Sequence, residues 1–342
     1  MKTAIITGVT GQDGSYLSEF LLDKNYTVVG CHRRNSTNNF HRVDHLLNND
    51  NFILEEFDLT DSASCQTLLS KYQPEELYNL AAQSHVGTSF NQPVFTFQAN
   101  TIGVSNLLEA IKSNSPRTKM YQASTSEMFG RNYSLSGVNN KYQDETTDFL
   151  PQSPYGVSKT AAHQLMTVYR LSYSIYTCCG ILFNHESPRR GENFVTRKIT
   201  NYIGKYKNGL TKEKLKLGNL SAQRDWGHAK DYVRAMWMMM QQVNPDDYVI
   251  CTGQTRSVQE FLDIAFDYAG LPTDELVDID TDLFRPAEVE YLKGSYAKAK
   301  ENLDWQPEIS FTNLVEEMVD SDVQKFRRPT IQKMENASLQ KR

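Results

Sequence analysis

The feature that most constrains the fold is a glycine-rich turn near the N-terminus. Thr3–Thr7 reads as a buried strand, and it leads directly into Gly8-Val9-Thr10-Gly11-Gln12-Asp13-Gly14. Residues 15–24 then place apolar side chains at helical spacing. Glycines between a strand and a helix let the backbone approach a pyrophosphate, which lies against the partial positive charge at the helix start. The segment therefore predicts a dinucleotide-binding fold.

Strand and helix patterns continue to alternate after this turn. Strands are predicted at residues 27–31, 52–55, 76–80 and 119–124, and helices at 62–71 and 95–114. Such alternation predicts a parallel sheet with helices on both faces. We expect an α/β protein with a Rossmann-type, doubly wound parallel sheet and a smaller C-terminal substrate-binding lobe. Residues 1–185 would form mainly the Rossmann domain, 186–326 mainly the lobe with some chain crossing back to the sheet, and 327–342 a polar tail.

The end of the second predicted strand indicates which dinucleotide is bound. NAD sites usually place an acidic residue about 20 positions after the glycine turn, where it binds the ribose 2′-hydroxyl. This chain instead has Arg33 and Arg34, followed by Asn35 and Ser36. Guanidinium groups suit a phosphate, so we predict NADP. A solvated basic loop is the alternative, and it would leave the choice of cofactor open.

Polar or small residues also follow the next two predicted strands. Leu80-Ala81-Ala82-Gln83-Ser84 would let the backbone lie against a nicotinamide ribose. After residues 119–124, the hydroxyl of Thr125 can bind a substrate oxygen, and Glu127 can act as a base. A serine-rich loop with a helix-capping acid is the alternative. Because ligands bind at the carboxyl ends of parallel strands, we expect these groups to meet in one crevice.

A helix start in the middle of the chain supplies a candidate proton acceptor. Residues 154–159 read Pro-Tyr-Gly-Val-Ser-Lys, and proline is favoured at a helix start. Tyr155 and Lys159 are four residues apart and share a helical face. A tyrosine has an ordinary pKa of about 10, and a fixed cation nearby favours its phenolate form. The pair alone also fits an exposed helix surface, but Thr125 and Glu127 upstream favour catalysis.

Composition limits the partners and the compartment. The formal net charge of −5 argues against a nucleic acid partner. The five cysteines are odd in number and lack metal-ligand spacing, which favours a reduced intracellular setting. The sequence shows neither an apolar run long enough for a membrane nor a signal peptide. We therefore expect a cytoplasmic protein with no nucleic acid, membrane or metal partner.

Several longer runs resemble one family. They are Arg33-Arg34 and residues 8–17, 122–127, 153–155, 180–191, 194–200 and 224–232. With these runs the chain resembles the GDP-mannose 4,6-dehydratases, in the extended short-chain dehydrogenase/reductase superfamily, from residue 1 to about residue 325. The glycine spacing is common to the superfamily, whereas residues 184–191 and 224–231 are specific to the family.

The resemblance implies a hydro-lyase. GDP-α-D-mannose would become GDP-4-keto-6-deoxy-D-mannose and water by internal hydride transfer through bound NADP, as the first step toward GDP-fucose or GDP-rhamnose-type deoxysugars. Tyr155, held as phenolate by Lys159 and the cationic nicotinamide, would take the 4-hydroxyl proton, and Thr125 would position that oxygen. Glu127 would remove the carbon 5 proton. Another nucleotide-sugar dehydratase or a 4-epimerase is the alternative. Ser126 argues against another dehydratase, and Glu127 argues against an epimerase. A silent NADP-binding scaffold is disfavoured because Tyr155 and Lys159 are both present.

The motifs and the resemblance together assign binding roles. The implied cofactor contacts are Gly8, Thr10, Gly11, Gln12, Asp13, Gly14, Arg33, Arg34, Asn35, Ser36, Asp58, Leu59, Leu80, Ala81, Ala82, Gln83, Ser84, Phe97, Tyr155, Lys159, His185 and Arg190. The implied substrate contacts are Ser84, Asn184, Val195, Lys198, Arg224, Arg285 and Glu288. Of the cations Arg190, Lys198, Arg224 and Arg285, several would surround the diphosphate and at least one would be only a surface charge.

Two positions depart from the family pattern, and the assembly stays open. Asn35 stands where the family more often has serine, and Phe97 where it often has tyrosine, so each weakens one expected cofactor contact. Residues 248–252, 258–269, 284–288 and 311–325 would build the smaller lobe over the sugar nucleotide. The resemblance implies a homodimer or homotetramer, with helices 95–114 and 155–172 pairing between subunits.

Overall fold

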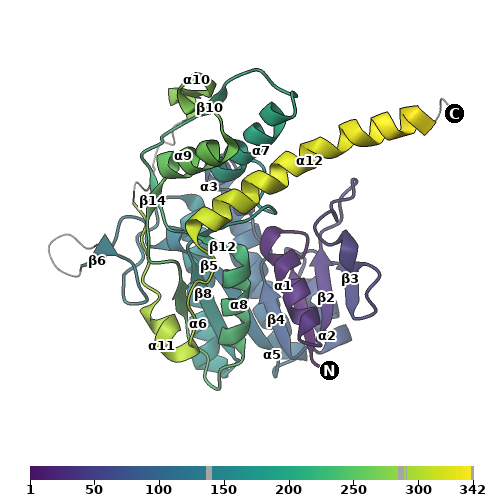
Figure 1. Ribbon diagram of the computed structural model, residues 1–342. Helices are drawn as coiled ribbons and strands as arrows, with labels where there is room; N and C mark the ends of the chain where they lie inside the picture. Colours follow the sequence, from purple (N-terminus) through teal and green to yellow (C-terminus); the bar gives the residue numbers. More distant parts are fainter. Residues whose placement is uncertain (136–140, 284–288, 290, 340–342) are drawn as a thin grey trace.

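A seven-stranded parallel sheet forms the centre of the molecule (Figure 1). The computed structural model describes residues 1–135, 141–283, 289 and 291–339. The strand order is β13-β8-β5-β4-β1-β2-β3, and every neighbouring pair is parallel. The strands are β1 (Thr3–Thr7), β2 (Thr27–His32), β3 (Phe52–Glu56), β4 (Glu76–Asn79), β5 (Lys119–Thr125), β8 (Thr177–Leu182) and β13 (Tyr248–Ile250). The predicted doubly wound sheet is confirmed.

Helices bury both faces of this sheet. One face packs against α1 (Gln12–Asp23) and α8 (Ala229–Met240), and the other against α2 (Ser62–Tyr72), α5 (Gly103–Asn114) and α6 (Pro154–Tyr173). Successive strand residues point to opposite faces, so Cys178 belongs to the first core and Cys179 to the second. All five cysteines are free and buried. Burial on both faces explains why the strands read as nearly continuous apolar runs.

The helix predicted over residues 95–114 is divided by a wider turn. It consists of α4 (Pro93–Phe97), a π-helical segment (Gln98–Ile102) and α5. The side chain of Asn100, inside the π-helical segment, accepts from the Gln83 backbone N–H at 2.9 Å and donates to the Gln83 carbonyl oxygen at 3.0 Å. π-Helical turns often occur at functional sites. Here the turn fixes the loop that follows β4.

A smaller lobe lies beyond the carboxyl ends of the strands. Its core forms mainly between α7 (Val195–Lys207), α9 (Val258–Ala269) and α12 (Phe311–Leu339). Arg197 of α7 is buried and pairs with Asp322 of α12 at 2.7 Å. Figure 1 shows α12 crossing the molecule and continuing beyond its body, so the helical backbone extends through most of the polar tail expected after residue 326.

One segment expected in the lobe belongs to the sheet. We predicted that residues 248–252 help to build the lobe, but β13 pairs in parallel with β8 and forms the sheet edge. Its three residues are fully buried, and α11 (Ala297–Leu303) packs against it. The short apolar run gave no sign of the long-range partner that decides where it lies. The domain boundaries at residues 185 and 326 stay a prediction.

Short elements complete the chain, some between the strands of the sheet and others within the lobe. They are α3 (Val86–Asn91), β6 (Ser134–Leu135), β7 (Lys141–Tyr142), β9 (Asn184–Glu186), β10 (Leu215–Leu217), β11 (Gln223–Arg224), β12 (Trp226–His228), β14 (Arg256–Ser257), α10 (Thr273–Leu276) and β15 (Val277–Ile279), with 3-10 turns at Asp44–Leu46, Ser126–Met128 and Thr281–Leu283. Among the residues described, no helix has the length and apolar character needed to cross a membrane.

Candidate active site

A single large cleft follows the carboxyl ends of six strands. Its volume is about 1770 Å³, and its walls come from the segments after β3, β2, β1, β4, β5 and β8 and from the facing lobe. The predicted residues that line it are Gly8, Thr10, Gly11, Gln12, Asp13, Gly14, Arg33, Arg34, Asn35, Asp58, Leu59, Leu80, Ala81, Ala82, Gln83, Ser84, Thr125, Glu127, Tyr155, Lys159, Asn184, His185, Arg190, Val195, Lys198 and Arg224. Positions far apart in sequence thus converge in one space.

Two of the predicted residues that the structure describes are not among those that line the cleft. Ser36 and Phe97 do not line it, although their neighbours Asn35 and Phe95 do. Phe97 is the last residue of α4, just before the π-helical segment turns the chain. Arg285 and Glu288 lie outside the described residues.

The glycine turn is shaped for a ligand that approaches the backbone closely. Gly8 has φ of +70°, and a Cβ added there would lie 2.9 Å from the backbone nitrogen of Ala81. A Cβ on Gly14 would lie 2.5 Å from the Gly8 carbonyl oxygen. Gly11 precedes α1 without a capping side chain, so the amides of the first helical turn are left to another partner. This arrangement fits a dinucleotide pyrophosphate.

A buried ion pair closes the cleft beside the glycine turn. His185 Nε2 lies 2.8 Å from Asp13 Oδ2, and its Nδ1 lies 2.8 Å from the Phe183 carbonyl oxygen. Burial alone would raise the pKa of Asp13, but the charge and hydrogen bond of His185 lower it below its ordinary value. Burial would lower the pKa of His185, and Asp13 raises it. The pair therefore joins α1 to the segment after β8.

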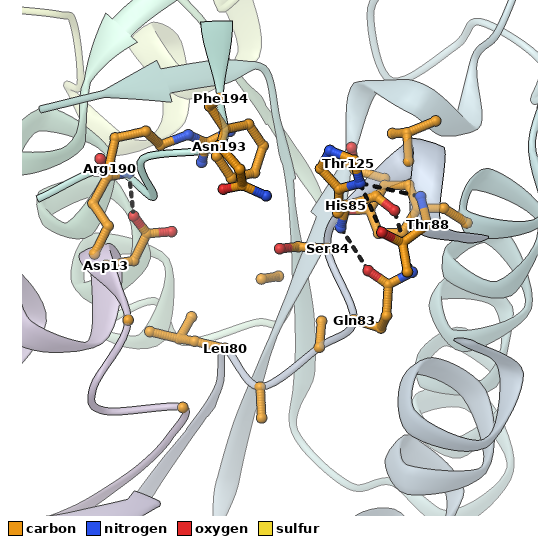
Figure 2. Close-up of a pocket in the computed structure, with 18 of the residues that line it drawn as sticks. Asp13, Leu80, Gln83, Ser84, His85, Thr88, Thr125, Arg190, Asn193 and Phe194 are labelled. Atoms are coloured by element: carbon orange, nitrogen blue, oxygen red, sulfur yellow. Dashed lines mark hydrogen bonds between the residues drawn. The ribbon is translucent and has the colours of Figure 1, made fainter. Parts of the chain in front are cut away.

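Arg190 lies above this pair in the loop that leads to α7. Its guanidinium stacks on the Phe194 ring at 3.7 Å, and its Nε lies 3.2 Å from Glu186. Buried Arg197 donates to the Arg190 carbonyl oxygen at 2.7 Å, which ties the loop to the lobe. Figure 2 shows Arg190, Asn193 and Phe194 on the wall opposite Ser84 and His85.

The candidate reacting groups lie at the adjacent end of the cleft. Ser153 accepts a hydrogen bond from the Gly156 N–H at 3.0 Å and caps α6, which puts Tyr155 in the first helical turn. Lys159 Nζ donates to the Ala123 carbonyl oxygen at 2.9 Å. Thr125 ends β5 and caps the short turn that carries Glu127. Tyr155, Lys159 and Thr125 are all buried.

Burial opposes the phenolate that we expected at Tyr155. Lys159 and the cationic nicotinamide together were expected to favour this form, and in the protein alone burial raises the pKa of Tyr155 to about 12, outweighing a hydrogen bond with Thr125 that lowers it. Burial also lowers the pKa of Lys159 to about 8, and its ammonium is bonded to Ala123. The desolvation of these two buried side chains thus exceeds the stabilisation of the phenolate expected from their spacing. A phenolate here requires further positive charge in the cleft.

The cleft contains several residues that the sequence did not single out individually. Among them are Thr88, Asn193, Phe194, Lys216, Asn219 and Trp226. Asn193 lies two residues after the family-specific run 184–191, and Phe194 begins the run 194–200, so these runs were a usable signal. Lys216 lies on β10, whose partner β15 is about sixty residues away in the chain. No local pattern could have predicted that pairing.

Comparisons with known proteins agree with this geometry. The GDP-mannose 4,6 dehydratase family profile matches residues 5–318. The chain is 50% identical to GDP-mannose 4,6 dehydratase 1 of Arabidopsis thaliana, covering 96% of this chain and 92% of that protein. It is 48% identical to the GDP-mannose 4,6-dehydratase of Vibrio cholerae, covering 94% of each.

Solved structures share the fold at lower identity. RMD from Pseudomonas aeruginosa, complexed with NADPH, has a TM-score of 0.78 and 22% identity, covering 95% of this chain and 100% of that one. The dTDP-glucose 4,6-dehydratase of Bacillus anthracis, in complex with NAD, has a TM-score of 0.83 and 20% identity, covering 96% and 98%. The extent of the family match, together with the cleft and its reacting groups, leads to one conclusion: the chain belongs to the GDP-mannose 4,6-dehydratase family.

Proposed function

We propose that this protein converts GDP-mannose to GDP-4-keto-6-deoxymannose and water, using NADP that is regenerated in each turnover. The observation that carries the proposal is the convergence of Thr125, Glu127, Tyr155 and Lys159 on one cleft with the glycine turn. These groups can serve one sugar ring beside one dinucleotide. Membership of the family supports the choice of GDP-mannose.

The choice of NADP rests on the residues after β2. Arg33 and Arg34 are exposed, line the cleft and follow the strand next to the glycine turn. Their guanidinium groups suit a 2′-phosphate. When bound, the oxidised nicotinamide accepts a hydride, returns it and brings positive charge into the site. Asp13 and His185 would close the pyrophosphate side of the cleft.

Tyr155 would accept the proton of the sugar 4-hydroxyl while Thr125 holds that oxygen. Lys159 contributes positive charge next to the strand end, where it is fixed by Ala123. The 4-keto group acidifies the hydrogen at carbon 5, and Glu127 would remove it as a proton. Glu127 would then give this proton to the departing 6-hydroxyl, which leaves as water. Tyr155 would return its proton to carbon 5 as hydride reaches carbon 6, so protons balance and one water is lost.

The GDP moiety would bind between the sheet and the lobe. Asn184, Val195, Lys198 and Arg224 line this side of the cleft, and Lys198 is exposed on α7. Cations with several donors bind a diphosphate well. Roles for Arg285 and Glu288 stay predictions. Ser84, which is exposed after β4, would reach either the cofactor or the sugar.

The test is conversion of GDP-mannose by the purified protein with NADP⁺. We expect mass spectrometry to show loss of one water, no net accumulation of NADPH, and the alkali-induced absorbance of a 4-keto sugar. UDP-glucose and dTDP-glucose, assayed in parallel, serve as matched substrates. Conversion of one of these instead of GDP-mannose would move the protein to another dehydratase or epimerase activity.

We also propose that the protein forms a homodimer through the helices beside the cleft. Large apolar side chains are exposed on α3, α4 and the π-helical segment and on α6, among them Val94, Ile102, Val168 and Leu171. Apolar side chains that recur on adjacent helices mark an interaction surface. We expect light scattering to give a dimer or larger assembly, and Val168→Glu with Leu171→Glu to shift it toward monomer.

A further inference from the structure

Three consecutive residues at the end of β5 are each held by α6. The strand residues are 123–125, and their partners Tyr155, Lys159 and His163 follow one another at intervals of four. Residues four apart lie on one helical face, so the three partners form a column along α6. The proposed mechanism uses the first two members of this column and gives His163 no part.

The contact of His163 is as direct as that of Lys159. His163 Nδ1 lies 3.0 Å from Ser124 Oγ, and both residues are buried. Lys159 Nζ lies 2.9 Å from the Ala123 carbonyl oxygen. Ser124 therefore sits between the strand residue bound by Lys159 and Thr125, the residue that meets Tyr155.

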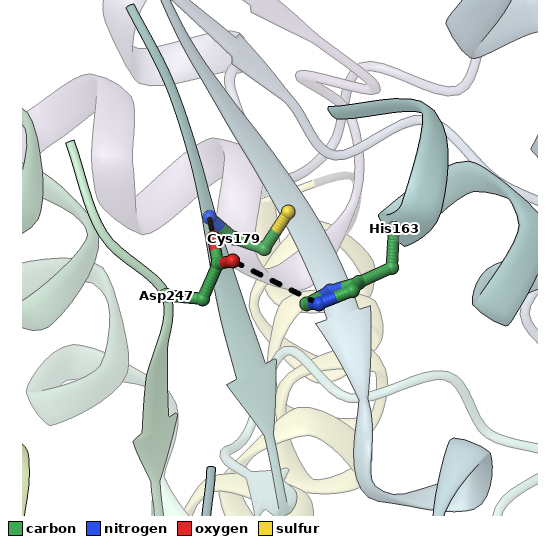
Figure 3. A group of neighbouring side chains, drawn as sticks. All are labelled: His163, Cys179 and Asp247. Carbon is green, nitrogen blue, oxygen red and sulfur yellow. Dashed lines mark hydrogen bonds and ion pairs between the residues drawn. The ribbon is translucent and has the colours of Figure 1, made fainter. Parts of the chain in front are cut away.

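The surroundings of His163 fix the orientation of its ring. Figure 3 shows the ring directed toward Asp247 and Cys179, and Nε2 lies 3.8 Å from Asp247 Oδ2. The other oxygen of Asp247 accepts from Arg170 at 2.5 Å and from the Cys179 N–H at 2.7 Å. Asp247 faces Nε2, and Nδ1 shares a hydrogen bond with the Ser124 hydroxyl whose donor is set by the tautomer of the imidazole.

A metal ion is the rival explanation of this cluster. Ligand atoms of His163, Cys179 and Asp247 all lie within 4.8 Å of one another. However, Arg170 already neutralises Asp247, and burial raises the pKa of the Cys179 thiol well above its ordinary range. A thiolate and a second cation would be unfavourable here. Hydrogen bonding accounts for the arrangement.

We propose that His163 is a positioning residue, which holds Ser124 and, through it, keeps Thr125 in line with Tyr155. This inference rests on the proposed dehydratase function. It adds a third contact between α6 and the reacting end of β5. Proton transfer needs the donor and acceptor oxygens within hydrogen-bond reach, so a small displacement of Thr125 slows the reaction. The GDP-binding side comes from other elements, so substrate affinity should change little.

The experiment compares His163→Ala, His163→Asn and Ser124→Ala in the full-length protein. An asparagine amide can take the place of Nδ1 opposite Ser124, whereas alanine cannot. We expect kcat to fall about tenfold in His163→Ala with KM for GDP-mannose within about twofold of wild type. His163→Asn should recover most of kcat, and the double variant His163→Ala/Ser124→Ala should be no slower than the slower single variant.

Thr167→Ala is the matched control on the same helix. Thr167 lies one turn beyond His163 and donates to its carbonyl oxygen at 3.5 Å. It is not one of the three α6 residues that hold residues 123–125 of β5. We expect kcat close to wild type there. Should His163→Ala fail to fold, Ser124→Ala and His163→Asn still test the same contact.

Three results would overturn the inference. They are an unchanged kcat in His163→Ala, equal kcat values in the alanine and asparagine variants, and losses that multiply in the double variant. The proposed function fails separately, because it requires wild-type protein to convert GDP-mannose at all. Zinc content of purified wild-type protein, measured by mass spectrometry, checks the rival explanation: one bound ion that is lost in His163→Ala would replace the proposed role.

Discussion

The two ends of the cleft shift the pKa values of their ionisable groups in opposite directions, toward the charged forms at one end and toward the neutral forms at the other. At the glycine turn, Asp13 and His185 form a buried ion pair, and each partner shifts the pKa of the other toward the charged form. At the end of β5, burial raises the pKa of Tyr155 to about 12 and lowers that of Lys159 to about 8. The protein supplies paired charge at the first end and disfavours charge at the second.

This difference indicates a division of labour. The ion pair beside the glycine turn already forms within the protein, so a dinucleotide meets a preformed wall there. At the reacting end burial disfavours the charged forms of Tyr155 and Lys159, so its proton transfers become accessible only when a ligand changes the electrostatics. Bringing charge into a low-dielectric site has large effects. Reaction before the cofactor is bound would thereby be suppressed.

Tyr155→Phe should give the largest effect and test the reacting end alone. Removing the hydroxyl eliminates the proposed proton acceptor, so we expect kcat for GDP-mannose to fall about 10³-fold. NADP⁺ affinity, measured by calorimetry, should stay within about threefold because the glycine turn is untouched. Tyr173→Phe, at the exposed end of the same helix, is the control and should match wild type. If Tyr155→Phe lost both NADP⁺ affinity and turnover, the two ends of the cleft would not act independently.

Gly8→Ala should disrupt the glycine-turn end of the cleft. Gly8 and Gly209 have nearly the same φ, +70° and +69°, but a Cβ at Gly8 would lie 2.9 Å from Ala81 while nothing lies within 4 Å at Gly209. Both substitutions cost backbone strain of about 1 kcal/mol. We expect Gly8→Ala to lower the free energy of unfolding by roughly 3 kcal/mol and to abolish NADP⁺ binding. Gly209→Ala should show the strain alone. Equal effects in urea unfolding would show that close packing at Gly8 is unimportant.

The sequence predicted the glycine end better than the reacting end. Gly8, Gly11 and Gly14 report backbone geometry directly, because only glycine fits where a Cβ would meet Ala81 or the turn itself. The positions of Tyr155 and Lys159 were also predictable from helical spacing. Their pKa values were not, since desolvation depends on how deeply the whole fold buries the pair.

Long-range pairing limited the other predictions. β13 reads as a short apolar run, and only its ladder with β8 shows that it closes the sheet. The π-helical segment before α5 has no distinct sequence pattern, although Asn100 uses it to bind Gln83. His163 likewise looked like one more polar residue on α6, because Ser124 and Asp247 lie far away in the chain.

His185→Gln should show that the glycine end depends on its ion pair. The raised pKa of His185 gives stability that is present below its ordinary value of 6.5 and is lost as pH rises through the folded value. The lowered pKa of Asp13 gives stability present above 3.8 and lost as pH falls through its folded value. We expect the substitution to cost roughly 3 kcal/mol between pH 3.8 and 6.5 and less at pH 9.

An exposed pair provides the control for this pH dependence. His45 Nε2 lies 2.6 Å from Glu19, but half of the His45 side chain is exposed. His45→Gln should therefore cost under about 0.5 kcal/mol at any pH. Urea unfolding at pH 5.5 and pH 9 measures all three proteins. If the loss of unfolding free energy in His185→Gln did not vary with pH, the Asp13–His185 ion pair would not distinguish the glycine end from the reacting end.

Lys159→Met should change the free energy of unfolding least, and it should raise it, whereas the preceding substitutions lower it. The folded pKa of Lys159, about 8, lies below its ordinary value of 10.5, so the unfolded chain binds this proton more tightly and stability rises between these pH values. Below pH 8 the charged ammonium destabilises the folded state. Methionine removes that cost together with the hydrogen bond from Lys159 to the Ala123 carbonyl oxygen, which still accepts from Gln122 Nε2 at 2.9 Å. We therefore expect the cofactor-free variant to gain about 1–2 kcal/mol at pH 7.

That gain should disappear above pH 10.5, where wild-type Lys159 is neutral in both states. Turnover of GDP-mannose should be lost at every pH, since the positive charge near Tyr155 is gone. Lys119→Met, at the other end of β5, is the control, because Lys119 is less buried and its gain should be smaller. Urea unfolding of cofactor-free protein from pH 7 to 11 measures the gain in stability of each variant. A variant less stable than wild type at pH 7 would mean that the reacting end tolerates charge as well as the glycine end does.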